Sequence, residues 1–400
     1  MKILHIDESF HTQYGYHTAP LAKMQAREGH EVTVITVPAD NLYPVFSEFG
    51  DNTPAKKILE YDREFDQKYD VKIIRVPISR YISGRAVYKK DIFKKIREIN
   101  PDVILCHNTD SLIAIQMIMK RHRYPVLFDS HMLAMASKNK LYKLYRMAYR
   151  IFITPRIKSS GVTIIRTQDD PYLNECLGIP KKQTPFISFG TDTQLFSPNE
   201  EIRKRIREKY GIGDDDFLVV YTGKLTEAKG AELFANAIQR EISTEIYHKV
   251  VFLIVGNTTG EYGKKIEDLF SQSENRIIRE PAQKYVDLPP FYQAADLSVF
   301  PRQCSMSFYD AQACGLPVIF EDNSVNVGRS RAGNAITFHS GDAEDFAAAI
   351  SKCANMDKLK YGTMRKNSIE YIKKSYDYTD IAEQYTNEMV ETREAFIRRK

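Results

Sequence analysis

The chain has 400 residues, of which 43% are hydrophobic and 27% charged, with a formal net charge of +5 at pH 7. This composition is typical of a globular protein and excludes a disordered chain, and the length favours two domains over one. So modest a charge gives no reason to expect a nucleic-acid partner. The five cysteines lack CxxC or Cys/His spacing, which argues against a disulfide framework and a zinc site.

The N-terminus, MKILHIDE, has no long apolar stretch and therefore does not resemble a signal peptide. Nowhere does the sequence reach the roughly 18 apolar residues that a membrane span requires. We therefore expect a cytoplasmic protein.

Short β-branched runs alternate with helical patterns through the first half of the chain. After KILHI, a helix is expected to end at Glu28 and Gly29. The following runs are EVTVITV, KIIRVPI, DVILCH, YPVLFDSH, GVTIIRT and TPFISFG. Apolar strands interleaved with helices predict a parallel, doubly wound sheet, so the first half forms one Rossmann-like domain.

The segment GTDTQLFSPNEEIRKRIREKYGIGDDD breaks this pattern with turn residues and a charged helix, which is typical of a linker. Strands then resume as FLVVYTG, KVVFLIVGN, RIIRE, DLSVFP, LPVIFED and AITF, and a terminal amphipathic helix follows. The fold class is therefore α/β, with two Rossmann-like doubly wound domains facing across a cleft. Ligands of such sheets bind at the carboxyl ends of the strands, so the chemistry is expected in that cleft.

The stretch YTGKLTEAKG, residues 221–230, joins a strand to a helix and carries Lys224 after Gly223 and Lys229 before Gly230. A helix N-terminus already has partial positive charge, so two ammonium groups beside it suggest an anionic ligand such as a diphosphate. Gly223 would let the backbone approach that ligand. The alternative is a strand turn with two solvated lysines, and the motif alone does not separate the two.

A second polar loop, PRQCSMSFYDAQACG, follows a strand and leads into a short helix. Ser305 and Ser307 could hold a phosphate, and Asp310 could accept hydrogen bonds from ribose hydroxyls. The alternative is a serine-capped helix with an aspartate in its first turn.

The order of GHEVTVIT, FGTDTQLFSP, YTGKLTEAKG, VFLIVGN, DLPPFYQAADLSVFP, DAQACGLPVIF and GDAEDFAAAI resembles glycosyltransferase family 4, which has the GT-B fold. The resemblance covers nearly the whole chain. It implies an acceptor-side domain at 1–195 and a nucleotide-sugar donor domain at 196–377. It also implies that the terminal helix 378–400 packs back on the first domain.

Residue by residue, the resemblance implies that Lys224 and Lys229 hold the donor diphosphate and that His131, which ends VLFDSH, contacts the donor sugar. His107, in DVILCHN, has a similar position and is a weaker candidate. Gly15 matches the glycine turn near the phosphates, and Asp310 the carboxylate that binds ribose. The donor loop is matched by Ser305, Met306 and Ser307.

The sequence departs from the family pattern in four places. Asp310 stands where the second of two glutamates is expected. Arg302 stands where the first of two glutamates is expected, the loop after it is short, and one glycine remains of the usual pair near residue 15. The ribose contact is therefore better preserved than the sugar contact.

Every charged residue from Lys138 to Lys158 is basic. On a helical wheel Lys143, Arg146 and Arg150 share one face, opposite an apolar face, and Pro155 is expected to end the segment. This pattern predicts an interfacial helix on anionic lipid headgroups, and an ordinary surface helix is the alternative.

We therefore expect a retaining glycosyltransferase that moves a sugar from a nucleotide diphosphate donor to a saccharide or lipid-linked saccharide, in surface polysaccharide or glycolipid assembly. The protein would be cytoplasmic, or peripheral on the inner face of the membrane. No cofactor or metal is expected, because lysines can neutralise the diphosphate. A catalytically weak scaffold and a nucleotide-sugar epimerase are the alternatives, whereas no GxGxxG follows a predicted strand as a nicotinamide enzyme requires.

Overall fold

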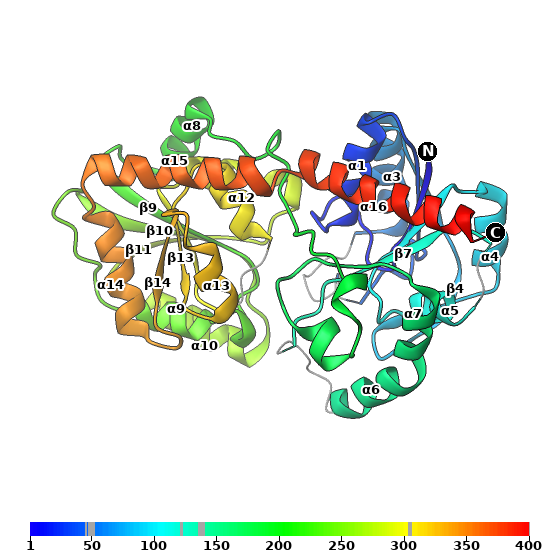
Figure 1. The fold of residues 1–400 in the computed structure, drawn as a ribbon. Coiled ribbons are helices and arrows are strands. Elements are labelled where there is room, and N and C mark those ends of the chain that lie inside the picture. The colour runs from blue at the N-terminus through cyan, green and yellow to red at the C-terminus, as the bar shows by residue number, and fades with distance from the viewer. Residues whose placement is uncertain (45, 47–52, 121–122, 135–140, 303–305, 400) are drawn as a thin grey trace. The chain divides into compact units, whose positions relative to one another are not determined.

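The computed structural model describes residues 1–44, 46, 53–120, 123–134, 141–302 and 306–399. Packing divides the chain into two units, Met1–Phe189 with Tyr378–Lys400, and Gly190–Asp377. The sequence analysis places the boundary six residues later, after residue 195. Each unit is a parallel sheet flanked by helices (Figure 1), so the predicted fold class of two Rossmann-like units is confirmed.

The sheet of unit 1 has the strand order β3-β2-β1-β6-β7-β8, and every neighbouring pair is parallel. Its central strands are buried on both faces, which explains why they are nearly continuous apolar runs. The strands are β1 (Lys2–Ile6), β2 (Glu31–Thr36), β3 (Val71–Arg75), β6 (Val103–Cys106), β7 (Val126–Ser130) and β8 (Ile164–Arg166).

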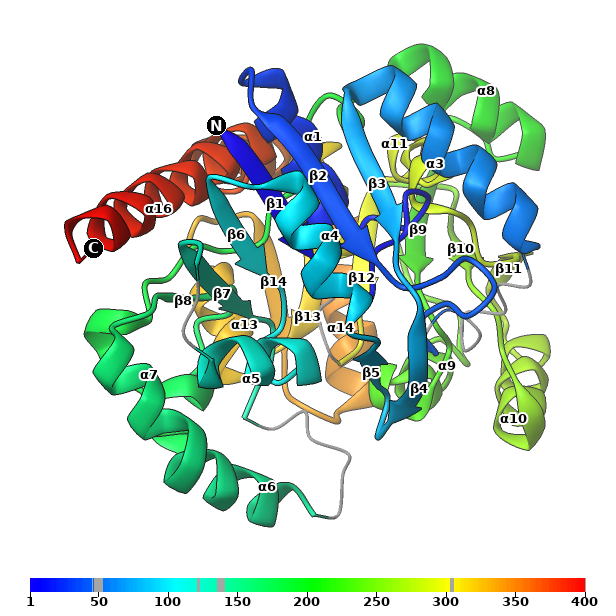
Figure 2. The same ribbon diagram turned by 90° about the vertical axis from the view of Figure 1, so that its right-hand side faces the viewer.

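Helices cover this sheet, and Figure 2 shows it with α6 and α7 forming one arc at the outer edge of the unit. The helices are α1 (Thr18–Arg27), α3 (Ala55–Tyr69), α4 (Asp91–Ile99), α5 (Leu112–Met119), α6 (Tyr142–Ala148), α7 (Thr154–Ser160) and α16 (Tyr378–Arg398). A π-helical segment, Tyr149–Ile153, joins α6 to α7, and Tyr172–Cys176 is another, followed by a 3-10 turn at Lys181–Gln183.

The C-terminal helix α16 belongs to unit 1 and packs on α1, β6 and β7. Both views place it beside α1 (Figures 1 and 2). Its buried side chains are Tyr378, Ile381, Ala382, Tyr385 and Met389. The first half of α16 therefore contributes to the core of unit 1.

Unit 2 repeats the architecture with the order β11-β10-β9-β12-β13-β14, again all parallel. Its strands are β9 (Asp216–Thr222), β10 (Lys249–Val255), β11 (Arg276–Glu280), β12 (Leu297–Phe300), β13 (Val318–Glu321) and β14 (Ala335–Phe338). Its helices are α8 (Glu200–Tyr210), α9 (Ala231–Ala237), α10 (Gly260–Ser271), α11 (Pro289–Ala294), α12 (Ser307–Ala313), α13 (Ser324–Arg329), α14 (Ala343–Ala354) and α15 (Lys358–Ser375), with 3-10 turns at Glu227–Lys229 and Tyr285–Asp287.

Three local predictions are wrong. An antiparallel hairpin, β4 (Ile78–Ile82) with β5 (Arg85–Tyr88), was not anticipated. The strand expected in TPFISFG is reduced to one bridge between Phe186 and Arg166. Pro155 does not end the basic helical segment, because it occupies the first turn of α7, where a missing N–H costs nothing.

The helices within the described residues include none that combines the length and apolar character needed to cross a bilayer.

Candidate functional site

The turn after β9 brings two backbones into contact. Gly223 has φ 143°, a backbone conformation in which a residue with a side chain would be strained. A Cβ on Gly256, which follows β10, would lie 1.9 Å from the carbonyl oxygen of Gly223. Glycine is therefore required at both positions, and the turns after two neighbouring strands form a surface of bare backbone beside Lys224.

Lys229 ends the next turn, and a third cationic residue packs there. Gly230 follows with φ 73°, and a Cβ on it would lie 2.9 Å from Cγ of Arg302. The Arg302 guanidinium donates to the carbonyl oxygen of Glu227 at 3.3 Å. The segment thus carries Lys224 and Lys229 and contacts Arg302, a charge arrangement suited to an anion.

The loop after β12 is only partly described, since Ser305 lies outside the described residues. Met306 is the N-cap of α12 and gives it no side-chain cap. Ser307, the first residue of the helix, is half-buried. These residues reach the end of unit 2 at which β9 and β12 terminate, because both strands run parallel.

Asp310 points into unit 2. It is 1% exposed and accepts hydrogen bonds from the hydroxyls of Thr191 at 2.5 Å and Tyr285 at 3.3 Å. Burial raises the pKa of its carboxyl to about 7, against the lowering effect of both hydroxyls. These two hydrogen bonds are internal to the unit, so a ribose contact stays a prediction.

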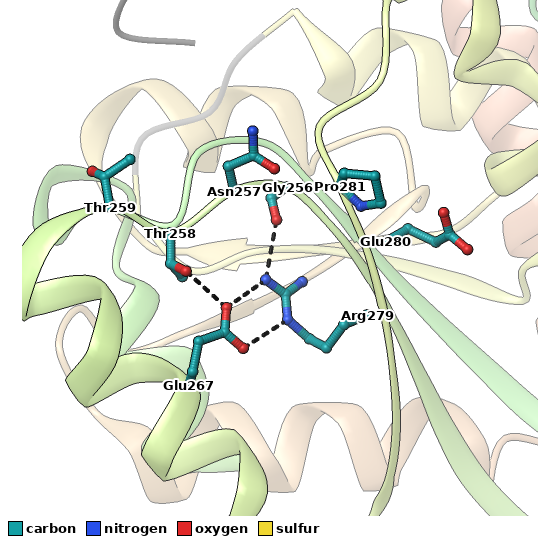
Figure 3. A pocket seen from close by; sticks show the side chains of 8 residues that line it. All are labelled: Gly256, Asn257, Thr258, Thr259, Glu267, Arg279, Glu280 and Pro281. Carbon is teal, nitrogen blue, oxygen red and sulfur yellow. Dashed lines mark hydrogen bonds and ion pairs between the residues drawn. The ribbon is translucent and has the colours of Figure 1, made fainter. Parts of the chain in front are cut away.

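A cavity of about 320 Å³ opens next to the glycine turns (Figure 3). The Arg279 guanidinium crosses it, donating to Glu267 Oε1 at 2.8 Å and to the carbonyl oxygen of Gly256 at 3.0 Å. Its polar walls come from the carboxyl ends of β10 and β11 and from α10, and the lining residues are Gly256, Asn257, Thr258, Thr259, Glu267, Arg279, Glu280 and Pro281. This cavity is not predictable from VFLIVGN, because the motif shows a strand and a turn but not the side chains of β11 and α10 that line the cavity with it.

The predicted glycine turn of unit 1 is also present. The N–H of Tyr16 donates to the carbonyl oxygen of Tyr14 at 2.8 Å, so Gly15 lies at the centre of a tight turn between β1 and α1. His17 follows two residues later as the N-cap of α1.

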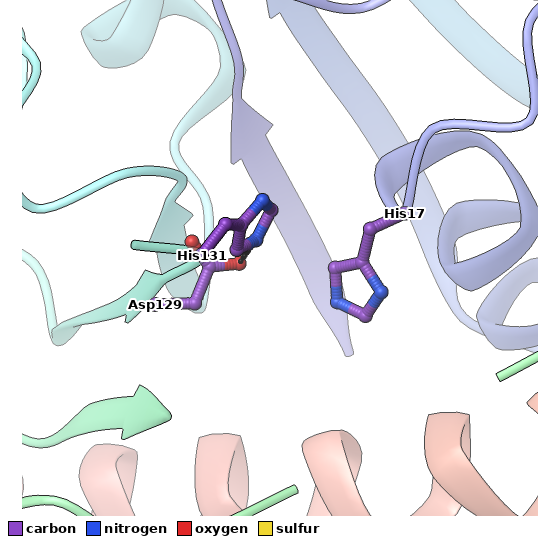
Figure 4. Close-up of side chains that lie close together, drawn as sticks. All are labelled: His17, Asp129 and His131. Atoms are coloured by element: carbon purple, nitrogen blue, oxygen red, sulfur yellow. Dashed lines mark ion pairs between the residues drawn. The ribbon is translucent and has the colours of Figure 1, made fainter. Parts of the chain in front are cut away.

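His131 lies directly after β7, and its side chain is 25% exposed. Its Nε2 is 3.3 Å from Oδ2 of Asp129, which is fully buried on the same strand. Figure 4 shows the two side chains beside His17. His107, the weaker candidate, donates from Nδ1 to the same carboxylate oxygen at 2.5 Å.

The sequence analysis found the two histidines that follow strands and missed Asp129, His5 and His17. A useful signal was present, because VLFDS places a carboxylate inside a strand that is otherwise apolar. Such a residue must be paired when the strand is buried.

Burial and charge shift the pKa values of His5, His17 and His107 in different directions. Burial, with the charge of His107, lowers the pKa of His5 to about 3, and burial lowers that of His17 well below its usual value. For His107, burial also lowers the pKa, but the Asp129 carboxylate outweighs it and the net shift is upward. The same pairing holds the pKa of Asp129 well below its usual range despite burial.

Among the described residues, ligand atoms of His17, Asp129 and His131 lie within 4.8 Å of one another, the spacing a metal site would need. However, Oδ2 of Asp129 accepts from His107, and Oδ1 accepts from the N–H of Asn108 at 2.8 Å. Both carboxylate oxygens are thus already hydrogen-bonded, which favours a network of side chains over an ion.

The basic helical segment contacts the rest of unit 1 through two arginines. Arg146 stacks on Tyr142 and Tyr172 and donates to the carbonyl oxygen of Ala134 at 2.7 Å. Arg150 donates to the carbonyl oxygen of Glu175 at 2.9 Å. Of the three predicted basic residues, the two arginines therefore hold the helix to unit 1, and Lys143 is exposed.

The exposed stripe of this segment is apolar instead. Its side chains are 53–67% exposed although all are large, and they are Leu141, Leu144, Met147, Ile151 and Phe152. The predicted apolar face is therefore not in the core. So many exposed hydrophobic side chains in one segment indicate an interaction surface.

The chain matches two protein-family models, a glycosyl transferase 4-like domain over residues 14–169 and glycosyl transferases group 1 over residues 216–356. A similar curated protein is the D-inositol 3-phosphate glycosyltransferase 1 of Catenulispora acidiphila, 28% identical over 162 residues. That match covers 38% of this chain and 38% of the relative, so the chain spans less than half the length of this relative.

Two solved structures show the same fold. A glycosyltransferase from Rickettsia africae aligns with a TM-score of 0.72 and 15% identity, covering 98% of each chain. Anabaena HepE in complex with UDP-glucose aligns with a TM-score of 0.72 and 17% identity, covering 98% of this chain and 100% of HepE. With one family model on each unit and this fold throughout, the chain belongs to glycosyltransferase family 4, of the GT-B fold.

Proposed function

We propose that the protein transfers a sugar from a nucleotide diphosphate donor to a saccharide or lipid-linked saccharide acceptor, with retention of configuration. The observation that carries the proposal is the turn from Gly223 to Gly230, which carries Lys224 and Lys229. Its bare backbone at Gly223 contacts Gly256, which lines a polar cavity. Support also comes from the relative that is named a D-inositol 3-phosphate glycosyltransferase and from HepE, which was solved with UDP-glucose.

In this reaction the bond between the sugar's anomeric carbon and the diphosphate breaks, and a bond to the acceptor oxygen forms on the same face. The acceptor proton passes to the departing phosphate. Lys224 and Lys229 stabilise the charge that grows on the leaving group, so no divalent cation is needed. Asp310 binds the ribose, Ser305, Met306 and Ser307 the donor, and His131 contacts the donor sugar.

The protein also docks peripherally on the inner face of the membrane, through the apolar stripe of α6 and the π-helical segment. Phe152 is 67% exposed and Leu141 64% exposed, and exposed Lys143 adds attraction to anionic headgroups. Such docking suits a lipid-linked acceptor and a role in surface polysaccharide or glycolipid assembly.

The first experiment is calorimetric titration of UDP, GDP, ADP and TDP, without metal, into wild type and the Lys224→Ala/Lys229→Ala variant. We expect one nucleotide to bind wild type and the double variant to lose at least about tenfold in affinity, since each charge-assisted contact contributes roughly 1.5–3 kcal/mol. The control is Lys264→Ala, an exposed lysine of unit 2 paired with Glu261.

Equal affinity of both proteins would refute the diphosphate assignment. A second candidate, binding without transfer, is favoured by Arg302, which replaces the first glutamate of the family pattern. Formation of a glycosylated product with any acceptor excludes it. Conversion of the donor without an acceptor would instead indicate an epimerase.

A further inference from the structure

Unit 1 contains a continuous chain of hydrogen bonds that runs from α16 to the carboxyl end of β7. Thr386 on α16 contacts both Glu28 and Gln25, and Gln25 on α1 contacts His5 on β1. His5 contacts His107, which contacts Asp129. All three residues at the inner end are buried, so each proton in the chain must have a defined acceptor.

The outer end of the chain fixes the orientation of Gln25. The Thr386 hydroxyl donates to Glu28 Oε2 at 3.2 Å, so its oxygen accepts from Gln25 Nε2 at 3.4 Å. Gln25 Nε2 also faces the sulfur of Met389 at 3.5 Å, which can only accept. The amide oxygen of Gln25 therefore faces inward.

That orientation fixes the tautomer of His5. Gln25 Oε1 lies 2.8 Å from His5 Nε2, and a carbonyl oxygen can only accept, so the His5 proton is on Nε2. Its Nδ1 then has only a lone pair to offer to His107.

His107 must consequently donate at both ends. Its Nε2 lies 3.0 Å from His5 Nδ1, which offers only a lone pair, and its Nδ1 lies 2.5 Å from Asp129 Oδ2. A neutral imidazole has one N–H, so this pattern requires either a charged His107 or a protonated Asp129. Asp129 also accepts from the N–H of Asn108 and lies 3.3 Å from His131, which favours its ionised form.

We propose that His107 is an imidazolium at neutral pH and that, through the Asp129 carboxylate, it positions His131. His131 Nε2 is buried, makes no hydrogen bond among the described residues and lies 3.3 Å from Asp129 Oδ2, so this carboxylate is the acceptor that we assign to its proton. Nδ1 is then left to accept a hydrogen bond from a hydroxyl group of the donor sugar. His107 and Asp129 are positioning residues, and this part rests on the function proposed for His131.

The surrounding charges favour the same protonation states, a neutral His5 and a charged His107. Burial keeps His5 and His17 neutral, whereas the pKa of His107 is raised because Asp129 outweighs its burial. Titratable groups from several elements face His107 and Asp129. They are His5 on β1, Asp7 directly after β1, His17 before α1, Cys106 on β6, His131 after β7 and Tyr385 on α16. Of these, the Asp7 charge further favours the charged form of His107.

The test is ¹⁵N NMR of protein labelled in its nine histidines, at about pH 7.5. We expect a signal from a histidine with protons on both ring nitrogens that is absent from His107→Gln, and a neutral His5 with its proton on Nε2. A His107 with a single N–H would overturn the proposal. The experiment needs neither the nucleotide-sugar donor nor the acceptor substrate, so it does not depend on the proposed function.

Two substitutions of Gln25 test the chain of hydrogen bonds without changing His107 or Asp129. Gln25→Glu keeps an acceptor toward His5 and should leave both protons on His107. Gln25→Met removes that acceptor, so His5 can donate from Nδ1 and His107 should lose its second proton at lower pH than in wild type. If His107 titrates identically in the two variants, the assigned order of hydrogen-bond donors from Gln25 through His5 to His107 is contradicted.

The positioning role has its own readout. Asp129→Asn should lower kcat at least about tenfold and displace the pH profile, because His131 loses its orientation. Nucleotide affinity should be unchanged, since the lysines of unit 2 are intact. An unaltered kcat and pH profile would overturn the positioning role, whereas failure of the wild type to bind any nucleotide would overturn only the proposed function.

Discussion

Individual residues of unit 2 were predictable where a motif brought charge and glycine together. Gly223, Lys224 and Lys229 were selected because cations beside a helix start need a reason, and the bare backbone at Gly223 agrees with that reasoning. The burial of Asp310 was not predictable, because its partner Thr191 is distant in sequence.

Asp310 provides a test of stability against pH. Its pKa is raised to about 7 from an ordinary value near 3.8, so the folded state binds the proton more tightly than the unfolded state. The shifted pKa of Asp310 adds to the free energy of unfolding. This contribution is fully present below about pH 3.8 and is lost as the pH rises through about 7. Between about pH 5.5 and pH 7 the loss is about 2 kcal/mol.

Asp310→Asn has no such proton, so its melting temperature should rise relative to wild type by several degrees over this interval. Melting curves of both proteins at matched pH measure the difference. Glu8, also buried, has a pKa raised to about 7, but it is present in both proteins and cancels. A constant difference in melting temperature across the interval would contradict the burial of an ionisable Asp310.

At the scale of elements, periodicity predicted the parallel strands well, because each buried strand is a run of apolar residues. It failed at the hairpin of β4 and β5, whose residues are largely exposed or half-buried and form no apolar run. It also left the orientation of α6 open between an interfacial helix and an ordinary surface helix. A helical wheel separates two faces but does not say which one packs, and here the aromatic rings of Tyr142 and Tyr172 hold Arg146.

The exposed stripe beside α6 gives a prediction about lipid binding. Ile151→Ser/Phe152→Ser should reduce sedimentation with phosphatidylglycerol vesicles at least about tenfold, because each exposed side chain inserted contributes roughly 1.5–3 kcal/mol. The control is Leu359→Ser, which removes an 81% exposed leucine from unit 2. Equal losses in the two variants, or binding unaffected by either, would show that the stripe does not dock on lipid.

At the scale of the whole molecule, the sequence indicated two similar domains but could not by itself assign the last helix. Its amphipathic pattern is compatible with either unit, and only the resemblance to the family placed it on the first. The structure places α16 in unit 1, where Tyr378 and Tyr385 are fully buried.

Calorimetry of a chain that ends at Asp377 tests this division. Loss of α16 uncovers α1, β6 and β7, so the transition of unit 1 should fall by at least about 10 °C or disappear, since several large buried side chains are removed. The transition of unit 2, identified by its rise with bound nucleotide, should stay within about 2 °C of its full-length value. A matched fall of both transitions would refute the assignment.

The return of the chain to unit 1 after residue 377 has a consequence during synthesis. Residues 190–377 are contiguous, so the second unit can fold as soon as it leaves the ribosome. The first unit, although translated earlier, lacks α16 until residues 378–398 have been made, and the apolar surface that α16 covers stays exposed until then. The second unit can therefore complete its fold before the first, although the first is translated earlier.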